Sequence, residues 1–486
     1  MPIIECRGEN LAAPLSEVLR LFCGPVTYLS ETTLQAEQDH PRLICQVNDN
    51  QVLVYLASEA SSEPLPGPMI LAADVRREAR RQLYRLLSDL TGIRFPWGSL
   101  TGIRPTLMAL DALNELGDTD QAVEVMRNRW MVAPDQAHLA VRVAEAEQQL
   151  MRELEAERPL LYIGIPFCPS RCLYCSFITQ EAQRQQHLLE PFCEKLVEEL
   201  RTLLALTSIK PRVIYVGGGT PSSLPENLLA WLLSEITGLI PGQTIKEFTF
   251  EAGRPDTLTA GKLACIREAG VTRICVNPQT FHDPTLERIG RKHTASQTKQ
   301  AFTAARQAGF SAINLDLIAG LPGESPADFL NSVRQALELE PDSLTLHALA
   351  LKRSSRLHRQ ITQDQTTTAF LGQTKPDRAW QQVMAEARSL LQEHGLEPYY
   401  LYRQKNVRAG LENVGFARPG QGCLYNVGMM SDRFPVLGLG CGAASKLING
   451  HQTRRLVNPR HAGHYIEHFP DFISKKKAFW LAGGHA

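Results

Sequence analysis

The sequence has no excess of charge of either sign. Lys and Arg together number 51 and Asp and Glu together number 51 among 486 residues, so the formal net charge at pH 7 is zero. A nucleic-acid-binding face or a basic membrane anchor usually depends on a surplus of Lys and Arg. The even balance therefore argues against nucleic acid and charged membrane surfaces as partners.

Long apolar runs are also missing. No uninterrupted apolar stretch approaches the roughly 20 residues that a membrane-spanning helix needs. The first ten residues, MPIIECRGEN, lack the charged and apolar regions of a signal peptide. The cysteine count of 11 is odd, and without export signals it favours a reducing compartment in which thiols serve as metal ligands or buried small residues. We therefore expect a cytoplasmic protein without a membrane span.

Three of these cysteines form the most informative feature of the chain. Cys168, Cys172 and Cys175 have C-x3-C-x2-C spacing in the segment LYIGIPFCPSRCLYCSF, directly after a strand-like apolar run. Three thiolates can bind three irons of a [4Fe–4S] cluster and leave the fourth iron open to a small molecule. The same spacing would also place three buried thiols on one helix face, but Pro166 and Pro169 oppose a regular helix here. We predict an iron–sulfur cluster with an open iron.

From residue 160 onwards, short apolar strands alternate with amphipathic helical segments. This alternation predicts right-handed βαβ units and a parallel sheet, an α/β fold. Six units are too few for a closed eight-unit barrel, so we predict a partial, open parallel βα barrel with its site at the carboxyl ends of the strands. The predicted strands are 161–165, 213–217, 247–252, 273–278, 313–318 and 343–349.

The length of the chain favours two or three domains. Residues 1–155 are expected to form an N-terminal α+β region, residues 156–350 the partial barrel, and residues 351–486 a C-terminal domain that covers the barrel mouth. Within these regions the patterns predict a hairpin over 43–57 and helices over 74–90, 134–157 and 377–394.

Glycine and polar residues gather where the predicted strands end. The glycines of GGGTP (217–221) would let backbone N–H groups approach a ligand, although a tight strand-to-helix turn has the same composition. Glu251 and Asp316 can accept hydrogen bonds from an amine or from ribose hydroxyls, or they can simply face solvent. Gln279 and Arg291 add an amide and a guanidinium to the same mouth, and Arg291 can pair with a carboxylate.

The cysteine motif after a strand, then GGGTP, then a strand-end Glu resembles the radical S-adenosylmethionine (SAM) superfamily. Within it, the segments YIGIPFC, FTFEAGRPDT and INLDLIAGLPGE resemble the oxygen-independent coproporphyrinogen III oxidases and their relatives, in particular the HemZ type. The likeness runs from about residue 100 to 450 and includes TGIRPT in the N-terminal region.

The resemblance implies roles for individual residues. Cys168, Cys172 and Cys175 would ligate a [4Fe–4S] cluster whose open iron SAM chelates. Asp316 would contact the SAM ribose and Ala350 its adenine. The full set of residues that the resemblance places around SAM is Tyr162, Tyr174, Gly218, Gly219, Thr220, Glu251, Gln279, Arg291, Asp316 and Ala350.

The resemblance also implies a reaction, in which an oxidoreductase of heme biosynthesis converts two propionates of coproporphyrinogen III to vinyl groups and forms protoporphyrinogen IX. An electron donor such as flavodoxin or ferredoxin would serve it. A substrate with four carboxylates needs cationic partners. The candidates are Lys352, Arg353, Arg403, Lys405, Arg454 and Arg455, each of which can also be an ordinary surface charge.

Two departures from the family pattern keep alternatives open. Gly164 stands where relatives often carry His, and Phe177 stands where the oxidases have a fourth Cys. Heme chaperones of the same superfamily share this C-x-F form, although the chain lacks their H-N-x-x-Y-W heme-binding motif. A heme chaperone without decarboxylase activity and a heme-degrading radical methyltransferase are the alternative functions.

Overall fold

The computed structural model divides the chain into two compact units. One consists of Met1–Ala144, Gln360–Gln381 and Leu401–Glu412, and the other of Glu145–Arg359, Gln382–Tyr400 and Asn413–Ala486. The residues that it describes are 3–7, 11–23, 42–48, 51–57, 75–102, 104–156, 158–177, 180–206, 210–240, 242–363, 377–405, 407, 410–449 and 452–482.

The first unit contains a small sheet with two helices packed on it. Its strands are β1 (Ile3–Arg7), β2 (Arg42–Asn48) and β3 (Gln51–Ala57), with β1 parallel to β2 and β2 antiparallel to β3. The hairpin predicted over 43–57 is therefore confirmed. Helices α1 (Ala12–Cys23) and α2 (Val75–Thr91) bury leucines such as Leu15 and Leu83 in a common core. The helices that follow are α3 (Thr106–Leu116), α4 (Thr119–Trp130) and α5 (Pro134–Met151).

The second unit is built on a long sheet whose central strands are parallel. The six predicted strands are confirmed, each to within three residues at either end. They are β4 (Leu160–Ile165), β7 (Val213–Gly218), β8 (Glu247–Glu251), β9 (Arg273–Cys275), β10 (Ala312–Ala319) and β11 (Ser343–Ala348). They lie side by side in chain order, all parallel. Nearly every residue in them is buried, as expected for a parallel sheet covered on both faces.

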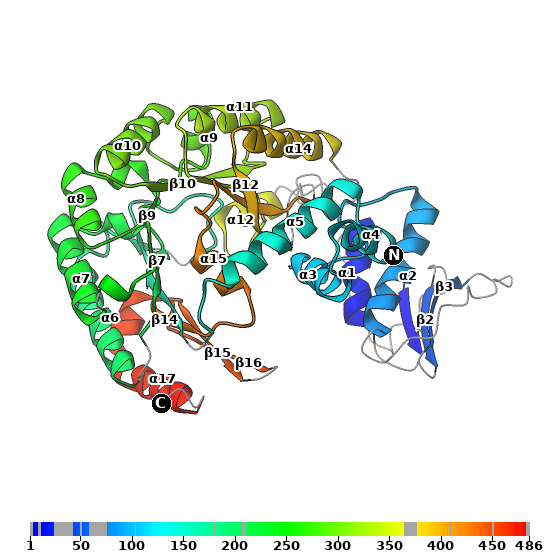
Figure 1. Cartoon of the computed structure of the whole chain (residues 1–486), viewed down its shortest axis with the longest axis horizontal. Coiled ribbons are helices and arrows are strands. Elements are labelled where there is room, and N and C mark those ends of the chain that lie inside the picture. Colours follow the sequence, from blue (N-terminus) through cyan, green and yellow to red (C-terminus); the bar gives the residue numbers. More distant parts are fainter. Residues whose placement is uncertain are drawn as a thin grey trace. The chain divides into compact units, whose positions relative to one another are not determined.

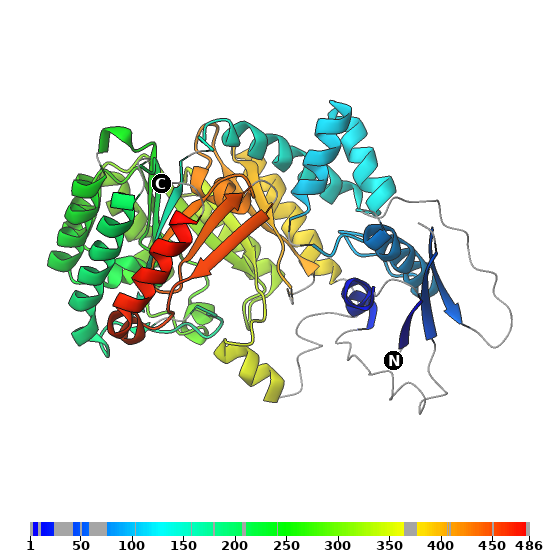
Figure 2. The ribbon, with the colours of Figure 1, turned by 90° about the horizontal axis from the view of Figure 1, so that it is seen from below.

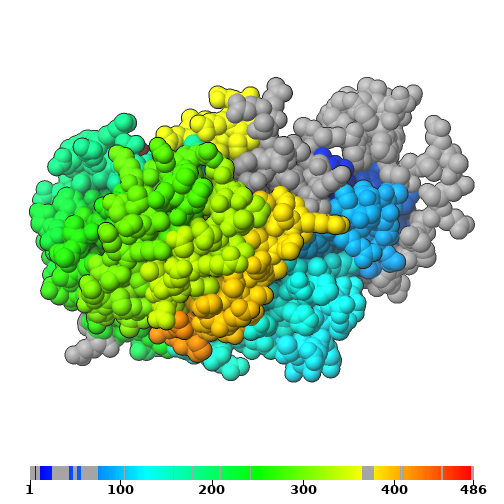
Figure 3. Space-filling view, turned by 90° about the horizontal axis from the view of Figure 1, so that it is seen from above, coloured from blue at the N-terminus to red at the C-terminus, as the bar shows by residue number. Residues whose placement is uncertain are grey.

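Helices follow the parallel strands and lie outside them in an arc (Figure 1). Two of these helices begin with a capping box, Thr294 with Gln297 and Ser325 with Asp328, which satisfies backbone N–H groups that the first helical turn leaves free. Figure 3 shows the green part of this layer as outer surface. The helices are α6 (Gln186–Leu206), α7 (Glu226–Leu239), α8 (Ala260–Glu268), α9 (Asp283–Arg288), α10 (Ala295–Gln307) and α11 (Pro326–Leu337).

The C-terminal third of the chain extends the same sheet at both edges. Strand β13 (Asn413–Ala417) pairs antiparallel with β11, whereas β14 (Val436–Gly440) pairs parallel with β4. Beyond β14 lie β15 (Ala444–Asn449) and β16 (Gln452–Val457), and beyond β13 lies β12 (Glu397–Tyr402). Figure 2 shows β15 and β16 in orange beside the red C-terminal helix. The remaining helices are α12 (Arg356–Gln363), α14 (Arg378–Glu393), α15 (Leu424–Met430), α16 (Ala462–Glu467) and α17 (Phe469–Leu481).

Among the described residues, no helix has both the length and the apolarity that crossing a membrane requires.

A buried ion pair fastens the C-terminal helices to the barrel. Glu199 of α6 and Lys476 of α17 are both fully buried and paired. Tyr465 donates its hydroxyl to Glu199 Oε2 (2.6 Å), and the backbone N–H of Gly440 donates to the same oxygen (2.9 Å). Lys476 also donates to Asn458 Oδ1 (3.0 Å). Every charge in this cluster is thus compensated, which is the condition under which a buried pair is tolerated.

Replacing Glu199 with Gln should lower the stability of the second unit, because Lys476 would stay buried without its counter-charge. We expect a loss of about 3–5 kcal/mol, seen as a lower urea midpoint by circular dichroism. The control is Glu198→Gln, which removes an exposed neighbouring carboxylate on the same helix that forms an ion pair with Lys195. Equal midpoints for the two variants would contradict the role of the cluster.

Candidate functional site

The segment after β4 is joined through its backbone to the glycine turn after β7. Gly219 donates its N–H to Ile165 O (2.7 Å), and Thr220 donates to Phe167 O (2.7 Å). A Cβ atom on Gly219 would lie 2.5 Å from Phe167 O, and Gly218 has φ +106°. Only glycine satisfies both conditions, because other residues have a Cβ and rarely adopt positive φ. The GGGTP segment is therefore a close-approach turn.

This contact places the first cysteine beside the turn. Cys168 Sγ lies 3.3 Å from Thr220 Oγ1. The rest of the cysteine loop is held from the opposite side, since Leu173 donates its N–H to Ile289 O and accepts one from Leu357. Cys172 is buried, whereas Cys168 and Cys175 are partly exposed. The loop is thus a rigid, non-helical turn, as Pro166 and Pro169 predict.

The three thiols share one electrostatic environment. The pKa of the Cys168 thiol is raised to about 12. Burial is the main cause and the charges of Cys175 and Cys172 add to it, while the hydrogen bond with Thr220 acts in the opposite direction. Burial likewise raises the pKa of Cys175. Metal binding would replace these protons. In the described part of the chain, no three His, Cys, Asp or Glu side chains converge on a single metal ion. A cubane cluster makes a different demand, since each thiolate binds its own iron.

Glu251 ends strand β8 directly over the glycine turn. It accepts hydrogen bonds from the Tyr215 hydroxyl and from the backbone N–H of Gly218. A Cβ atom on Gly217 would lie 2.6 Å from Glu251 Oε2, so the carboxylate fills the space that this glycine leaves. The pKa of Glu251 is raised to about 7. Burial is the main cause and the charge of Asp316 adds to it, while the hydrogen bond from Tyr215 acts in the opposite direction.

Asp316 provides a second carboxylate from strand β10. It accepts a hydrogen bond from Asn314 Nδ2 (2.8 Å) and lies 3.7 Å from His347 Nε2. Burial alone would raise the pKa of Asp316, but His347 together with Asn314 and Thr345 lowers it below its ordinary value. The mouth therefore contains one carboxylate that stays ionised and one that titrates near neutral pH.

The other predicted SAM residues surround these carboxylates. Gln279 has φ +73° and bridges to β10, because it donates its N–H to Asp316 O and accepts one from Ile318. Arg291 donates to Asn277 O (2.5 Å) and contacts both Tyr174 and Cys172. Tyr174 is thereby placed in the cysteine loop against a buried cation.

Among the described residues, Tyr162 and Ala350 are not linked to Glu251 or Asp316 by a hydrogen bond. The Tyr162 ring belongs to a stack with Tyr215 and Tyr425, with centroid separations of 6.2 Å and 6.0 Å. Burial raises the pKa of Tyr162. Ala350 follows β11, where the N–H of Leu349 donates to Ala319 O and ties the ends of β11 and β10 together. Tyr162 thus belongs to strand β4, and Ala350 lies two residues beyond the end of β11.

The backbone packing explains the glycine at position 164. A Cβ atom on Gly164 would lie 2.9 Å from Cys441 O, and one on Gly440 would lie 2.2 Å from Gly164 O. The pairing of β14 with β4 therefore leaves no room for the His that relatives often carry here. Phe177, at the position of the fourth Cys of the oxidases, is 66% exposed.

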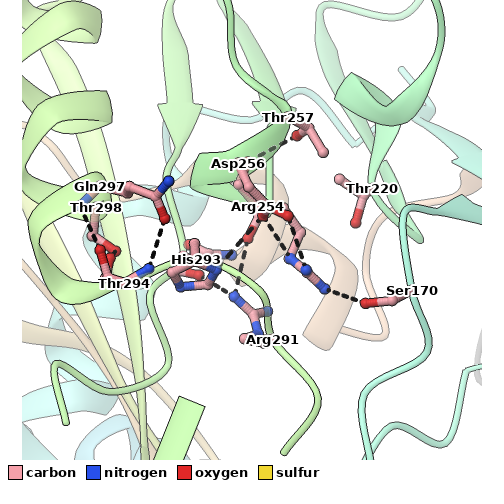
Figure 4. A network of polar contacts seen from close by, with 12 residues as sticks. Ser170, Thr220, Arg254, Asp256, Thr257, Arg291, His293, Thr294, Gln297 and Thr298 are labelled. Carbon is pink, nitrogen blue, oxygen red and sulfur yellow. Dashed lines mark hydrogen bonds and ion pairs between the residues drawn. The ribbon is translucent and has the colours of Figure 1, made fainter. Parts of the chain in front are cut away.

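A polar network beside Cys172 was missed by the sequence reasoning (Figure 4). Arg254 is 2% exposed and donates to both carboxylate oxygens of Asp256 (2.9 and 3.1 Å). It also donates to Ser170 Oγ (3.2 Å) and lies 3.8 Å from Cys172 Sγ. His293 Nδ1 lies 3.6 Å from Asp256. The signal in the sequence is the Arg-Pro-Asp that follows Glu251-Ala-Gly, two charges after a strand end.

The candidate cations for a carboxylate substrate are dispersed. Arg403 donates to Leu100 O and lies over the Trp97 ring, while Lys405 pairs with Glu17, all within the first unit. Arg454 and Arg455 belong to β16, near Phe479 and Asp432 respectively. Lys352 and Arg353 alone among the six follow a barrel strand, β11, at its carboxyl end.

Comparison with known proteins identifies the family. A sequence model of the Radical SAM superfamily matches residues 162–336. The oxygen-independent coproporphyrinogen-III oxidase-like protein HemZ of Bacillus subtilis is 36% identical over 399 residues, a match that covers 80% of this chain and 78% of HemZ. The chain belongs to the HemZ family of radical SAM proteins. Radical SAM proteins use a [4Fe–4S] cluster and SAM, so these are its cofactors, and the three-thiol loop has the donor set that such a cluster needs.

Other proteins similar to this HemZ-family chain carry different names, as heme chaperones or as oxidases. The heme chaperone HemW of Bacillus subtilis is 31% identical over 317 residues, which covers 65% of this chain and 76% of HemW. Among solved structures, coproporphyrinogen III oxidase HemN of Escherichia coli matches with a TM-score of 0.49 and 21% identity, over 68% of this chain and 73% of HemN.

Glu251 should make the stability of the cofactor-free protein depend on pH. Because its pKa is raised from 4.5 to about 7 in the folded state, its contribution is fully present below about pH 4.5 and is lost as the pH rises to 7. The loss is at most about 3 kcal/mol. Urea unfolding from pH 4.5 to 8 should show this decline in the wild type and not in Glu251→Gln. Parallel pH profiles for the two proteins would refute it, and Glu287→Gln, an exposed change on α9, serves as control.

Proposed function

We propose that this protein catalyses the oxygen-independent oxidative decarboxylation of two propionate side chains of coproporphyrinogen III, giving protoporphyrinogen IX. The observation that carries the proposal is the extent of the likeness to HemZ. It covers 80% of the chain, whereas the superfamily segment ends at residue 336. The likeness therefore includes chain beyond the shared cofactor-binding part, where a family distinguishes its substrate.

In this proposal Cys168, Cys172 and Cys175 ligate the cluster. Cys168 lies beside Thr220 of the glycine turn, and Cys172 and Cys175 are near enough for their charges to act on it. When bound, the cluster and SAM supply a 5′-deoxyadenosyl radical that can remove a hydrogen atom from the β-carbon of a propionate. Loss of carbon dioxide from the resulting substrate radical, with transfer of one electron to a one-electron acceptor, would then leave a vinyl group.

The proposed SAM contacts follow from the chemistry of the mouth. The ionised Asp316 suits ribose hydroxyls, and Glu251 suits a donor such as the SAM amino group. In the proposal, backbone groups of Gly218, Gly219 and Thr220 also contact SAM. The remaining proposed contacts are Gln279, Arg291, Tyr162, Tyr174 and Ala350. The barrel holds SAM and substrate in fixed relation and excludes water from the reacting carbon.

Lys352 and Arg353 are the cations that we propose for the substrate carboxylates, because they follow β11 at the carboxyl end of the barrel strands. Lys352 is half-buried, and this burial lowers the pKa of its amine. No ion pair is recorded for either residue within the described ranges. A one-electron donor such as flavodoxin or ferredoxin would reduce the cluster.

An anaerobic turnover assay tests the proposed reaction. With reconstituted cluster, a reductant, SAM and coproporphyrinogen III, we expect two successive losses of the mass of formic acid from the porphyrin, together with 5′-deoxyadenosine. Chromatography with mass detection follows both products. Deoxyadenosine without any change in the porphyrin would overturn the decarboxylase assignment.

A heme chaperone is the second candidate, favoured by the likeness to HemW and by Phe177 after the last cysteine. The same preparation mixed with heme decides between them. Stoichiometric heme binding without turnover would indicate the chaperone, whereas consumption of heme in the presence of SAM would indicate a methyltransferase that opens the ring.

Single replacement of Cys168, Cys172 or Cys175 by Ala should abolish assembly of the cluster, because each thiolate holds one iron. We expect the rate of 5′-deoxyadenosine formation to fall by at least about 100-fold, with loss of the visible absorption of the cluster. Cys265→Ser on α8 is the matched control, since it removes a partly exposed thiol elsewhere and should keep both signals. Full cluster content in any of the three Ala variants would sink the ligand assignment.

A further inference from the structure

Arg254 is placed beside the cysteine loop by the turn after β8. Gly253 has φ +70° and donates its N–H to Cys275 O (3.0 Å), so the chain turns sharply just before Arg254. The Arg254 side chain then runs inward and is 2% exposed. Its Nη1 atom reaches Ser170 Oγ (3.2 Å) and Cys172 Sγ (3.8 Å), so one nitrogen faces two residues of the cysteine loop.

Asp256 fixes the direction of this guanidinium. Nε and Nη2 of Arg254 donate to the two carboxylate oxygens, which leaves Nη1 to face Ser170 and Cys172. Two parallel hydrogen bonds of this kind hold a guanidinium in one orientation. Figure 4 shows Arg254 between Asp256 and Ser170. The arrangement aims a donor at a sulfur atom, which a lone flexible cation would not do.

The charge of Asp256 does not cancel that of Arg254 at the sulfur. The Asp256 side chain is 20% exposed, whereas that of Arg254 is 2% exposed. Water therefore screens the carboxylate more than the guanidinium, and the guanidinium is also the nearer group. Arg291 is a second cation in contact with Cys172, but it also donates to Asn277 O and contacts Tyr174.

Reduction of the cluster adds one negative charge to a group that three thiolates already make electron-rich. Hydrogen bonds to the sulfur ligands and nearby positive charge favour the more negative, reduced form, and so raise the reduction potential. SAM cleavage starts only from the reduced cluster, so a residue that stabilises this form acts on the step that precedes all others.

We propose that Arg254, oriented by Asp256, is a positioning residue that holds Cys172 and Ser170 in place and raises the reduction potential of the cluster. This inference rests on the proposed assignment of Cys172 as a cluster ligand, but it does not depend on which porphyrin is the substrate.

The test is an EPR-monitored redox titration of the full chain with reconstituted cluster. Arg254→Gln should shift the midpoint potential to a more negative value. Arg254→Lys keeps the charge but loses the paired hydrogen bonds to Asp256, so its potential should lie between those of Arg254→Gln and the wild type. The rate of 5′-deoxyadenosine formation in Arg254→Gln should fall several-fold with dithionite and recover with the stronger reductant titanium(III) citrate. A purely structural role would not give this recovery.

The matched control is Arg273→Gln, which removes another buried guanidinium at the opposite end of the sheet, beside Glu247. Its potential should equal that of the wild type. An unchanged potential in Arg254→Gln with full cluster content would overturn the inference. If Arg254→Gln assembles no cluster, the potential of Arg254→Lys is measured instead. A potential of Arg254→Lys equal to that of Arg273→Gln would then overturn the inference. Full cluster content in Cys172→Ala would instead overturn the ligand assignment, which keeps the two failures distinct.

Discussion

The site depends on one backbone contact, between the chain that leaves β4 and the glycine turn that leaves β7. In the parallel register Gly164 lies opposite Gly217 and Ile165 opposite Gly218, and hydrogen bonding continues past the strands to Gly219 and Thr220. Any side chain at Gly219 would strike the Phe167 carbonyl. Because this contact sets the distance from Cys168 to Thr220, the first thiol and the turn are placed together by main-chain geometry.

The same glycines decide the electrostatics of the mouth. The space without a side chain at Gly217 is filled by the Glu251 carboxylate, which the Gly218 N–H and the Tyr215 hydroxyl then stabilise. Asp316, two strands away, is kept ionised by His347. Two carboxylates with separated pKa values at the end of a parallel sheet are the pattern expected where a ligand brings its own positive charge. In the proposed assignment, the sulfonium and amino groups of SAM would provide that charge.

Most of the barrel could be predicted because its strands are buried on both faces. Such strands appear in the sequence as short apolar runs between amphipathic helices, and all six were located from this pattern. The edges of the sheet could not be found in this way. The pairing of β14 with β4 joins residues that are 276 positions apart, such as Val436 and Leu160, and local periodicity contains no information on it. The closeness of Gly164 to Cys441 follows from that pairing and was equally invisible.

Glu251 and Asp316 were predicted as polar groups at or near strand ends, and this rule works because the carboxyl ends of the strands converge in a parallel sheet. Glu251 is the last residue of β8, and Asp316 lies three residues before the end of β10. It overlooks Arg254, which lies three residues beyond its strand and becomes relevant only through its distance to Cys172.

Two groups of buried polar side chains in the second unit differ in how completely they are hydrogen-bonded. Around Glu199, the side chains of Lys476, Tyr465 and Asn458 satisfy one another, as buried groups do when their task is to hold elements together. At the mouth, the buried Asn277 Oδ1, Arg291 Nε and His293 Nε2 have no hydrogen-bond partner within the described chain. Leaving such atoms unpaired costs free energy that packing alone does not return. Within the same described residues, Arg273 Nε lacks a hydrogen-bond partner as well, although it lies at the amino end of its strand, so a missing partner does not by itself mark a ligand site. It is the position of Arg291 Nε, on a guanidinium that contacts Cys172, that makes this atom available to a ligand of the cysteine loop.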